Sequence, residues 1–375
     1  MRHLMLSIRS LCLGGCIVFT SYTTVRAEEV RPRELQIVVA QASQSAQNSD
    51  RLNDLLRRGQ ELVEAEDYAQ ALSVYQEAAT LEPSNARIFS GIGYLQAQQG
   101  DLQAAARSYE QAIALDGDNP DFYFALGYIR ANLDNYAEAA SAYRRVVELS
   151  SDNIDAYLGL GVVMARQGNY PEAIAAYERV LELQPNNLQA GEFIGAAFIR
   201  QERYQEAIDV LEKAIEFAPR NQQSTLHLNL GVAWVNLGDL AAGLAEFQQA
   251  ANLDPRNAQV HLQIGDLLRA QNNIEAAIDA YQHAAALQPS LSEAHVLIGD
   301  LWLEQQDYLR AIIAYREFVE LQPNDPDGYY KLGLALQGRD RTQEAIAALE
   351  QARALYDQQG NVEGVETIEA LLDEF

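Results

Sequence analysis

The sequence predicts an all-α protein, a right-handed α-solenoid of nine paired-helix repeats that ends in a capping helix. The first observation behind this prediction is a glycine that recurs every 34 residues, with one spacing of 36 between Gly195 and Gly231. The second is a small residue twelve positions after each glycine, and the third is a large residue four positions further on. The glycines are Gly59, Gly93, Gly127, Gly161, Gly195, Gly231, Gly265, Gly299 and Gly333. Self-similarity at such a period is typical of stacked repeats.

Each repeat is predicted to consist of two antiparallel helices joined by a short polar turn. Apolar residues fall at helical spacing over 122–132 and 137–149, and Asp134-Asn135 separates the two segments. The glycine and the small residue are expected where the helices approach closely, because a larger side chain would push them apart. The large residue, such as Tyr143, fills the space beside them. A proline, such as Pro185, ends the second helix of most repeats.

The N-terminal segment 1–27 has the order of a secretory signal. Basic residues precede an apolar run over 11–20, and Ala27 follows at the position where a signal peptidase would cut. The apolar run is too short to span a bilayer comfortably. We therefore expect an exported, periplasmic protein that is not inserted in a membrane after cleavage. Two alternatives are lipidation at Cys16 and an uncleaved N-terminal segment that anchors the protein to a membrane.

Composition and missing motifs exclude several classes of function. The chain carries 27 Lys+Arg against 53 Asp+Glu, a formal net charge of −26, so it repels the phosphates of nucleic acids and of acidic membrane surfaces. Both cysteines, Cys12 and Cys16, precede the expected cleavage site, which leaves no thiol ligand or nucleophile. There is no phosphate-binding glycine loop, no Gly-x-Ser-x-Gly elbow and no His-Glu-x-x-His motif. The sequence therefore predicts a protein that is not an enzyme.

The remaining boundaries follow from the repeat period. Residues 28–51, which are rich in Gln, Ser and Ala, are expected to form a flexible leader. Residues 360–375 carry apolar residues on one face, including Ile368 and Leu372, and are expected to form a helix that caps the last repeat. The nine repeats between them are predicted at 52–85, 86–119, 120–153, 154–187, 188–223, 224–257, 258–291, 292–325 and 326–359.

This pattern of glycine, alanine, aromatic residue and proline at fixed offsets resembles the tetratricopeptide repeat family, and it matches nine times over 52–359. The departures are two extra residues near Gln222 and Gln223, Gly243 in place of alanine, and a ninth repeat without its proline, while Gly117 and Ser151 stand in place of proline in two other repeats. The resemblance implies that the first helix of each repeat lines a concave groove. It also implies that the groove binds an extended peptide segment of a client protein.

The residues that the resemblance places on this wall fall into zones. The first zone is aromatic, and the second is a ladder at one equivalent position of successive repeats. The aromatic zone is Tyr94, Phe124 and Tyr128, and the ladder is Asn132, Arg166, Arg200 and Asn236. Arginine side chains bind carboxylates, and asparagine amides form hydrogen bonds with peptide groups, so the ladder suits an extended peptide. The alternative is that these are ordinary solvated residues of a wide groove.

A third zone of the wall is acidic. Its candidate metal ligands are Asp266, Asp300, Glu304 and Glu293. Carboxylate oxygens suit a hard cation such as manganese, calcium or magnesium, and the alternative is a merely negative surface without a cofactor. Three histidines, His227, His261 and His295, also recur at one repeat position. The spacing of packed helices keeps them too far apart to share one ion, so we interpret them as replacements for an aromatic filler.

These features together predict an exported, non-enzymatic scaffold that acts as an assembly or targeting factor for a protein client. The signal-like segment, the nine repeats and the acidity resemble periplasmic tetratricopeptide factors of oxygenic photosynthetic bacteria, which implies a role of the photosystem II biogenesis type. The alternative is a component of an envelope secretion or polysaccharide-export complex. The oligomeric state stays open.

Overall fold

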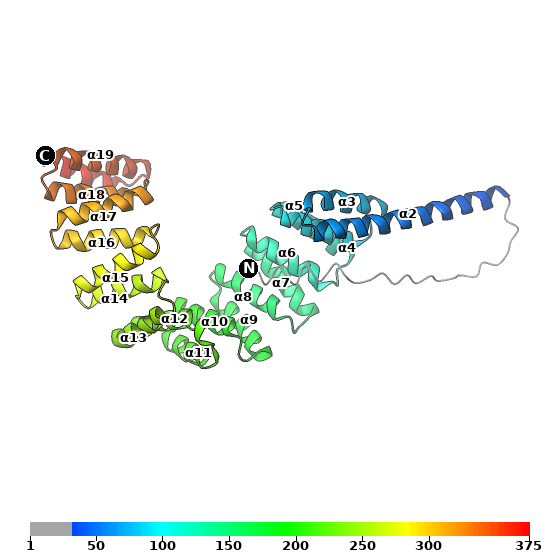
Figure 1. The fold of residues 1–375 in the computed structure, drawn as a ribbon, viewed down its shortest axis with the longest axis horizontal. Helices are drawn as coiled ribbons and strands as arrows, with labels where there is room; N and C mark the ends of the chain where they lie inside the picture. The colour runs from blue at the N-terminus through cyan, green and yellow to red at the C-terminus, as the bar shows by residue number, and fades with distance from the viewer. Residues whose placement is uncertain (1–31) are drawn as a thin grey trace. The chain divides into compact units, whose positions relative to one another are not determined.

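The computed structural model describes residues 32–375, with side chains from Gln47 onward. In this part of the chain there are nineteen α-helices, one short 3-10 helix and no strand, which confirms the predicted all-α solenoid (Figure 1). The signal-like segment 1–27, with the alternative lipidation site at Cys16, lies outside the described residues. None of the helices in 32–375 is both long enough and apolar enough to span a membrane.

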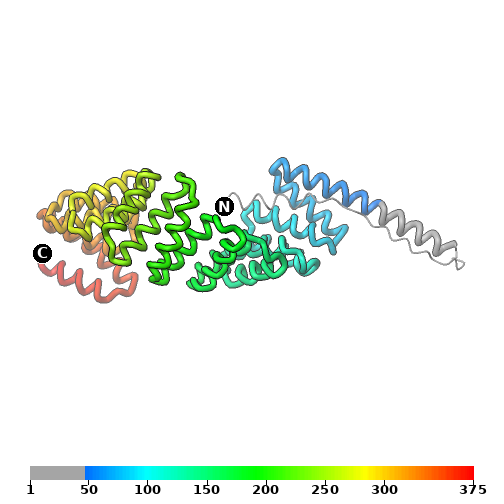
Figure 2. The backbone as a smooth tube through the Cα atoms, turned by 90° about the horizontal axis from the view of Figure 1, so that it is seen from below, coloured from blue at the N-terminus to red at the C-terminus, as the bar shows by residue number. Residues whose placement is uncertain are grey.

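The chain forms two compact units, which are described separately and divide after Ala197. The first unit contains α2 (Pro32–Glu64), α3 (Tyr68–Leu81), α4 (Ala86–Gln98), α5 (Leu102–Leu115), α6 (Pro120–Asn132), α7 (Tyr136–Leu149), α8 (Ile154–Arg166), α9 (Tyr170–Leu183) and most of α10 (Leu188–Arg200). Consecutive helices form antiparallel pairs, which the backbone trace of Figure 2 also shows. Each pair is one repeat, with an even-numbered first helix and an odd-numbered second helix.

The second unit continues the same alternation. It contains α11 (Tyr204–Phe217), the 3-10 helix η2 (Arg220–Gln222), α12 (Ser224–Leu237), α13 (Leu240–Leu253), α14 (Ala258–Ala270), α15 (Ile274–Leu287), α16 (Ser292–Glu304), α17 (Tyr308–Leu321), α18 (Pro326–Gly338), α19 (Thr342–Gln358) and α20 (Val362–Leu372). The two inserted residues noted in the sequence fall where η2 precedes α12. The last helix, α20, packs against α19, and its Ile368 is completely buried.

Short polar residues set where the helices begin. Asp67, Asn85 and Asp101 precede α3, α4 and α5, and each side chain accepts a hydrogen bond from a backbone N–H of the first turn. Such caps satisfy donors that the helix itself leaves unpaired. The turn between the two helices of a repeat needs one residue with positive φ, and Gly100 meets this need at 85° without a steric cost.

The repeated glycine and the large residue pack directly against each other. A Cβ atom added to Gly161 would lie 2.2 Å from Cε1 of Tyr177, and one added to Gly265 would lie 2.4 Å from Cε1 of Tyr281. Both tyrosine rings are at most 2% exposed. The period of 34 residues is therefore explained by a packing requirement, because each ring occupies the space that a side chain on the first helix would fill.

The flexible leader predicted for 28–51 is wrong for its described residues. Helix α2 begins at Pro32 and runs without a break through 33 residues into the first repeat. Proline is tolerated in the first turn of a helix, where its missing N–H has no partner to lose. No glycine or proline occurs between Arg33 and Arg58, and alanine, glutamine, leucine and arginine all favour helix. A composition that we interpreted as a linker is thus equally compatible with a helical extension.

Candidate functional site

The first helices lie on the side where neighbouring repeats approach most closely. In the first unit α6 contacts α8, and in the second unit α16 contacts α18, although a second helix lies between the members of each pair in the chain. Such contacts arise when a stack of helix pairs curves toward its first helices. We call the solvent-facing side chains of the first helices the inner face of their unit.

Two of the three aromatic residues expected on the inner face belong to the core instead. Tyr94 and Phe124 are each 9% exposed, and the ring of Phe124 packs edge-on against Tyr143 with ring centroids 5.7 Å apart. Burial of an aromatic ring is strongly favourable, and the neighbouring helices cover these two positions. Tyr128, which is half-buried, is left as the aromatic member of the inner face in the first unit.

The polar ladder is exposed, and its amides and guanidinium groups differ in how they are engaged. The Nδ2 of Asn132 donates to the carbonyl oxygen of Tyr128 at 2.7 Å, and the Nδ2 of Asn236 donates in the same way to Val232 at 2.8 Å. Each amide therefore keeps its oxygen for another partner. The ladder residues occupy equivalent positions in their repeats, but the first two lie in the first unit and the last two in the second.

Arg166 and Arg200 are the exposed last residues of α8 and α10. Among the side chains described from Gln47 onward, neither guanidinium has a hydrogen bond or a carboxylate partner, and Arg166 interacts only electrostatically with the hydroxyl of Tyr136. Other guanidinium groups are engaged, such as that of Arg144, which donates to Glu172 at 2.7 Å. A positive charge at a helix C-terminus also stabilises the helix dipole, so these arginines support their helices while their five donors stay available.

Helix α10 also carries Glu192, a half-buried carboxyl group. Burial raises its pKa above the ordinary value of 4.5. The folded state therefore holds this proton more tightly than the unfolded state does. The protonated Glu192 carboxyl therefore contributes folding stability at low pH. This contribution is lost as the pH rises from the pKa of the unfolded state through the raised pKa of the folded state.

We therefore expect Glu192→Gln to raise the melting temperature slightly at pH 7.5, because it removes a half-buried charge without changing the shape of the side chain. The gain should shrink as the pH falls toward 4, where the wild-type carboxyl is protonated. Melting curves at the two pH values test this. Glu178→Gln, which changes an exposed carboxylate on the same unit, should leave both temperatures unchanged.

The structure does not assemble the four carboxylates that were candidate metal ligands. Asp266 accepts a hydrogen bond from the Tyr281 hydroxyl at 2.7 Å, and Asp300 accepts one from Tyr315 at 2.8 Å. Lys331 also donates to both oxygens of Asp300, at 2.8 and 2.9 Å. In the described part of the chain, no three His, Cys, Asp or Glu side chains are placed to hold an ion.

The other two candidate ligands are equally separate. Glu304 accepts a hydrogen bond from Arg269 at 2.9 Å, and Glu293 is exposed. Protein donors thus engage three of the four candidate carboxylates, those of Asp266, Asp300 and Glu304. The sequence analysis missed these aspartate–tyrosine pairs, although an aspartate stands 15 residues before the tyrosine in both, at Asp266–Tyr281 and at Asp300–Tyr315.

The three equivalent histidines connect their helices to neighbouring elements. The Nε2 atoms of His261 and His295 lie 3.1 Å from the carbonyl oxygens of Pro255 and Pro289, in the turn before each helix. His227 differs, since its Nδ1 lies 2.6 Å from Oε2 of Glu246. These imidazoles serve as polar links between a first helix and its surroundings, a role that the aromatic-filler interpretation did not include.

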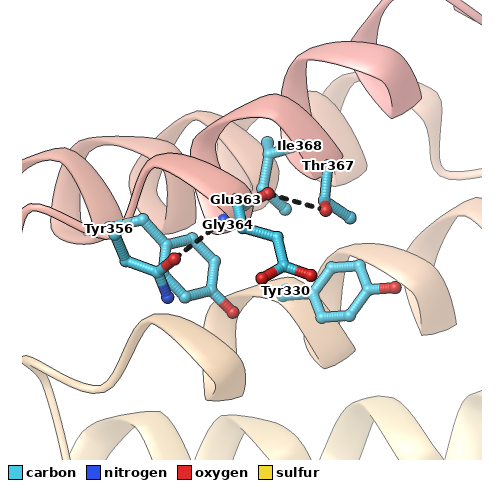
Figure 3. Close-up of a pocket in the computed structure, with 7 residues that line it drawn as sticks. Tyr330, Tyr356, Glu363, Gly364, Thr367 and Ile368 are labelled. Carbon is cyan, nitrogen blue, oxygen red and sulfur yellow. Dashed lines mark hydrogen bonds between the residues drawn. The ribbon is translucent and has the colours of Figure 1, made fainter.

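A small pocket lies at the end of the second unit, between the capping helix α20 and helices α18 and α19. It has a volume of about 250 Å³ and is lined by Tyr330, Tyr356, Asn361, Glu363, Gly364, Thr367 and Ile368 (Figure 3). The ring of Tyr330 comes from a first helix, whereas Glu363 comes from the first turn of α20. The sequence predicted a cap at this end, but nothing in it indicated a hollow beneath the cap.

Comparison with known proteins identifies the repeats as tetratricopeptide repeats. A tetratricopeptide repeat model matches residues 56–120, 93–154, 124–187, 158–222 and 262–326, and a second tetratricopeptide repeat model matches 327–358. A tetratricopeptide repeat-containing protein of Picosynechococcus sp. is 50% identical over 48 residues. These residues are 13% of this chain and only 12% of the length of that relative.

One solved structure shows the same architecture over most of the chain, and a second resembles a shorter part of it. A tetratricopeptide repeat protein from Parabacteroides merdae covers 68% of this chain with 99% of its own, at a TM-score of 0.52 and 18% identity. The crystal structure of MamA protein covers 45% of this chain with 92% of its own, at a TM-score of 0.44 and 25% identity. Since the repeat models alone match more than half of the residues, this chain belongs to the tetratricopeptide repeat family.

Proposed function

We propose that the protein is an exported, non-enzymatic scaffold that holds an extended peptide segment of a client protein on its inner face. Stacked helix repeats of this family are generally protein-interaction surfaces. The observation that carries the proposal is the exposed guanidinium of Arg166, which makes no hydrogen bond or ion pair with the side chains that the structure describes. Tyr128 and Asn132 lie on α6, the first helix that contacts α8, so the three side chains belong to adjacent parts of the same inner face.

Each of these groups fits one component of a polypeptide. A guanidinium presents a planar fork of donors that matches a carboxylate or two peptide carbonyls. The free oxygen of the Asn132 amide can accept a peptide N–H, and the ring of Tyr128 can pack against an apolar side chain. The net charge of −26 repels strongly acidic chains, so the client segment should be neutral or basic overall, with one carboxylate or a set of carbonyls for Arg166.

The biological setting is proposed from the sequence. The signal-like segment supports a role outside the cytoplasm, as an assembly or targeting factor of the photosystem II biogenesis type. Mass spectrometry of proteins that co-purify with the tagged full chain tests this setting. Recovery of a photosystem reaction-centre precursor would support it, whereas recovery of secretion or polysaccharide-export components would favour the alternative setting in the cell envelope.

Arg166→Glu tests the inner face directly. We expect it to lower client recovery about tenfold or more, because it removes charge-assisted hydrogen bonds and places a like charge against the client carboxylate. Quantitative mass spectrometry of the captured proteins provides the measurement.

The matched control is Arg107→Glu, which makes the same change of charge on the exposed surface of α5, a second helix of the same unit. It should retain the client. Unchanged capture by Arg166→Glu, or an equal loss with both variants, would remove the inner face of the first unit from the proposal.

A further inference from the structure

The pocket beneath the capping helix combines three kinds of wall. Tyr330 and Tyr356 contribute aromatic rings, and Ile368, which is completely buried, lies beneath them at the base of the pocket. Glu363 contributes a carboxylate that points toward the ring of Tyr330 in Figure 3. A charged group beside an aromatic ring and an apolar surface offers a separate contact to each part of an amphipathic side chain.

Several other polar groups of the pocket already have partners. The backbone N–H of Gly364 donates to Oδ1 of Asn361 at 3.0 Å, and the hydroxyl of Thr367 donates to the backbone oxygen of Glu363 at 2.8 Å. The hydroxyl of Tyr356 donates to Asp327. The carboxylate of Glu363, by contrast, has no ion-pair partner among the described residues.

The surroundings of the pocket are negative. No lysine, arginine or histidine lines it, and Asp325 and Asp327 lie close by. Burial first, and then the hydrogen bond to Asp327 and the charges of both aspartates, raise the pKa of the Tyr356 hydroxyl. An anionic ligand would be repelled here, whereas a cation would lower the electrostatic free energy of the site.

We propose that this pocket binds a single basic side chain, lysine or arginine, of a client polypeptide. The cationic head would pair with Glu363 and lie against the ring of Tyr330, and the aliphatic stem would pack along the aromatic lining of the pocket. A volume of about 250 Å³ is below the roughly 300–1,000 Å³ of sites for drug-sized ligands, so it suits one side chain.

The proposal rests on the proposed function in one respect, namely that the cation belongs to a polypeptide. Tyr330 lies on α18, a first helix, so a segment held along the inner face of the second unit can place one side chain in the pocket. It adds a specificity determinant to that function, because a client would need a basic residue at the position that reaches the capping helix.

A short peptide of glycine and serine with one central lysine is the probe. The full chain is labelled at isoleucine and threonine methyl groups, and the resonances of Ile368 and Thr367 are followed by NMR as the peptide is added. We expect saturable shifts that weaken with salt. The same peptide with acetyl-lysine, which keeps the stem and loses the charge, should produce no such shifts, and equal shifts would overturn the proposal.

Variants assign the effect to the carboxylate and the ring. Glu363→Gln should weaken peptide binding about fivefold, and Tyr330→Leu should weaken it by a similar factor. Glu366→Gln removes the same charge from an exposed position of α20 outside the pocket lining and should bind as the wild type does. Equal affinities of Glu363→Gln and Glu366→Gln would overturn the proposal.

Two further results distinguish a polypeptide ligand from a small polyamine, and the pocket proposal from the inner-face proposal. Free putrescine that binds more tightly than the peptide would overturn the assignment to a polypeptide and favour a small polyamine. The peptide titration involves only the second unit, so it is independent of client capture by Arg166. Binding of the lysine peptide together with unchanged client capture by Arg166→Glu would support the pocket and contradict the inner-face proposal for the first unit.

Discussion

Replacement of Gly161 by alanine lowers the unfolding free energy of the repeats around it by about 1–2 kcal/mol. The added Cβ would lie 2.2 Å from Cε1 of Tyr177, and that ring is 2% exposed and enclosed by its neighbours. Overpacking costs about 1–3 kcal/mol, and so close an approach belongs to the upper part of that range, above the gain of roughly 1 kcal/mol that alanine brings to a helix interior. Urea unfolding followed by circular dichroism measures the loss.

Gly117→Ala is the matched control for Gly161→Ala. It makes the same chemical change in the same unit, but its Cβ would meet only ordinary contacts, the nearest being the carbonyl oxygen of Ile113 at 3.6 Å. This variant should be neutral or slightly stabilising. The double variant Gly161→Ala, Tyr177→Leu should lose less than the sum of its two single variants, because the ring that causes the clash is gone. Strict additivity would contradict the packing explanation.

Ile368→Asp should detach the capping helix from the second unit. The side chain is 0% exposed in a cluster with Leu349, Ala352 and Tyr356, where an unpaired carboxylate cannot be accommodated. Loss of this apolar contact removes about 2–3 kcal/mol of docking free energy. Limited proteolysis should then cleave before α20, and binding of the lysine peptide should disappear because one wall of the pocket is lost.

Val362→Asp places the same carboxylate on the same helix at a position that is 67% exposed. We expect no loss of protection here, because a negative charge in the first turn is favourable to a helix. Equal proteolysis of the two variants would show that the added charge, rather than the buried contact of Ile368, controls the docking of α20.

The fold was predictable because each repeat depends on local packing. Gly161 and Tyr177 are 16 residues apart, and the requirement that connects them recurs in the other repeats, so the period is visible in the sequence alone. The leader was not predictable in this way. Its composition lacks helix breakers after Pro32, but the same residues are also common in linkers, and only the structure distinguishes the two.

The candidate site was only partly predictable. Arg166 and Asn132 hold equivalent positions in their repeats, which predicted that both lie at the end of a first helix and face solvent. Both side chains are exposed in the structure. The same equivalence could not show that neighbouring helices cover Tyr94 and Phe124, because burial depends on how adjacent repeats pack. It also could not show that Lys331 and Tyr315 bind Asp300, since these partners are 31 and 15 residues away.

By itself, the sequence determined the repeat architecture, the membership of the chain in its family and the acidic character of the protein. These properties depend on residue types at fixed spacings and on summed charge, both of which are local or additive. Only the tertiary structure decided which side chains are accessible, which carboxylates already have partners, and that a pocket forms beneath α20. The reason is that accessibility and pairing depend on residues brought together from different helices, so they exist only once the helices are packed.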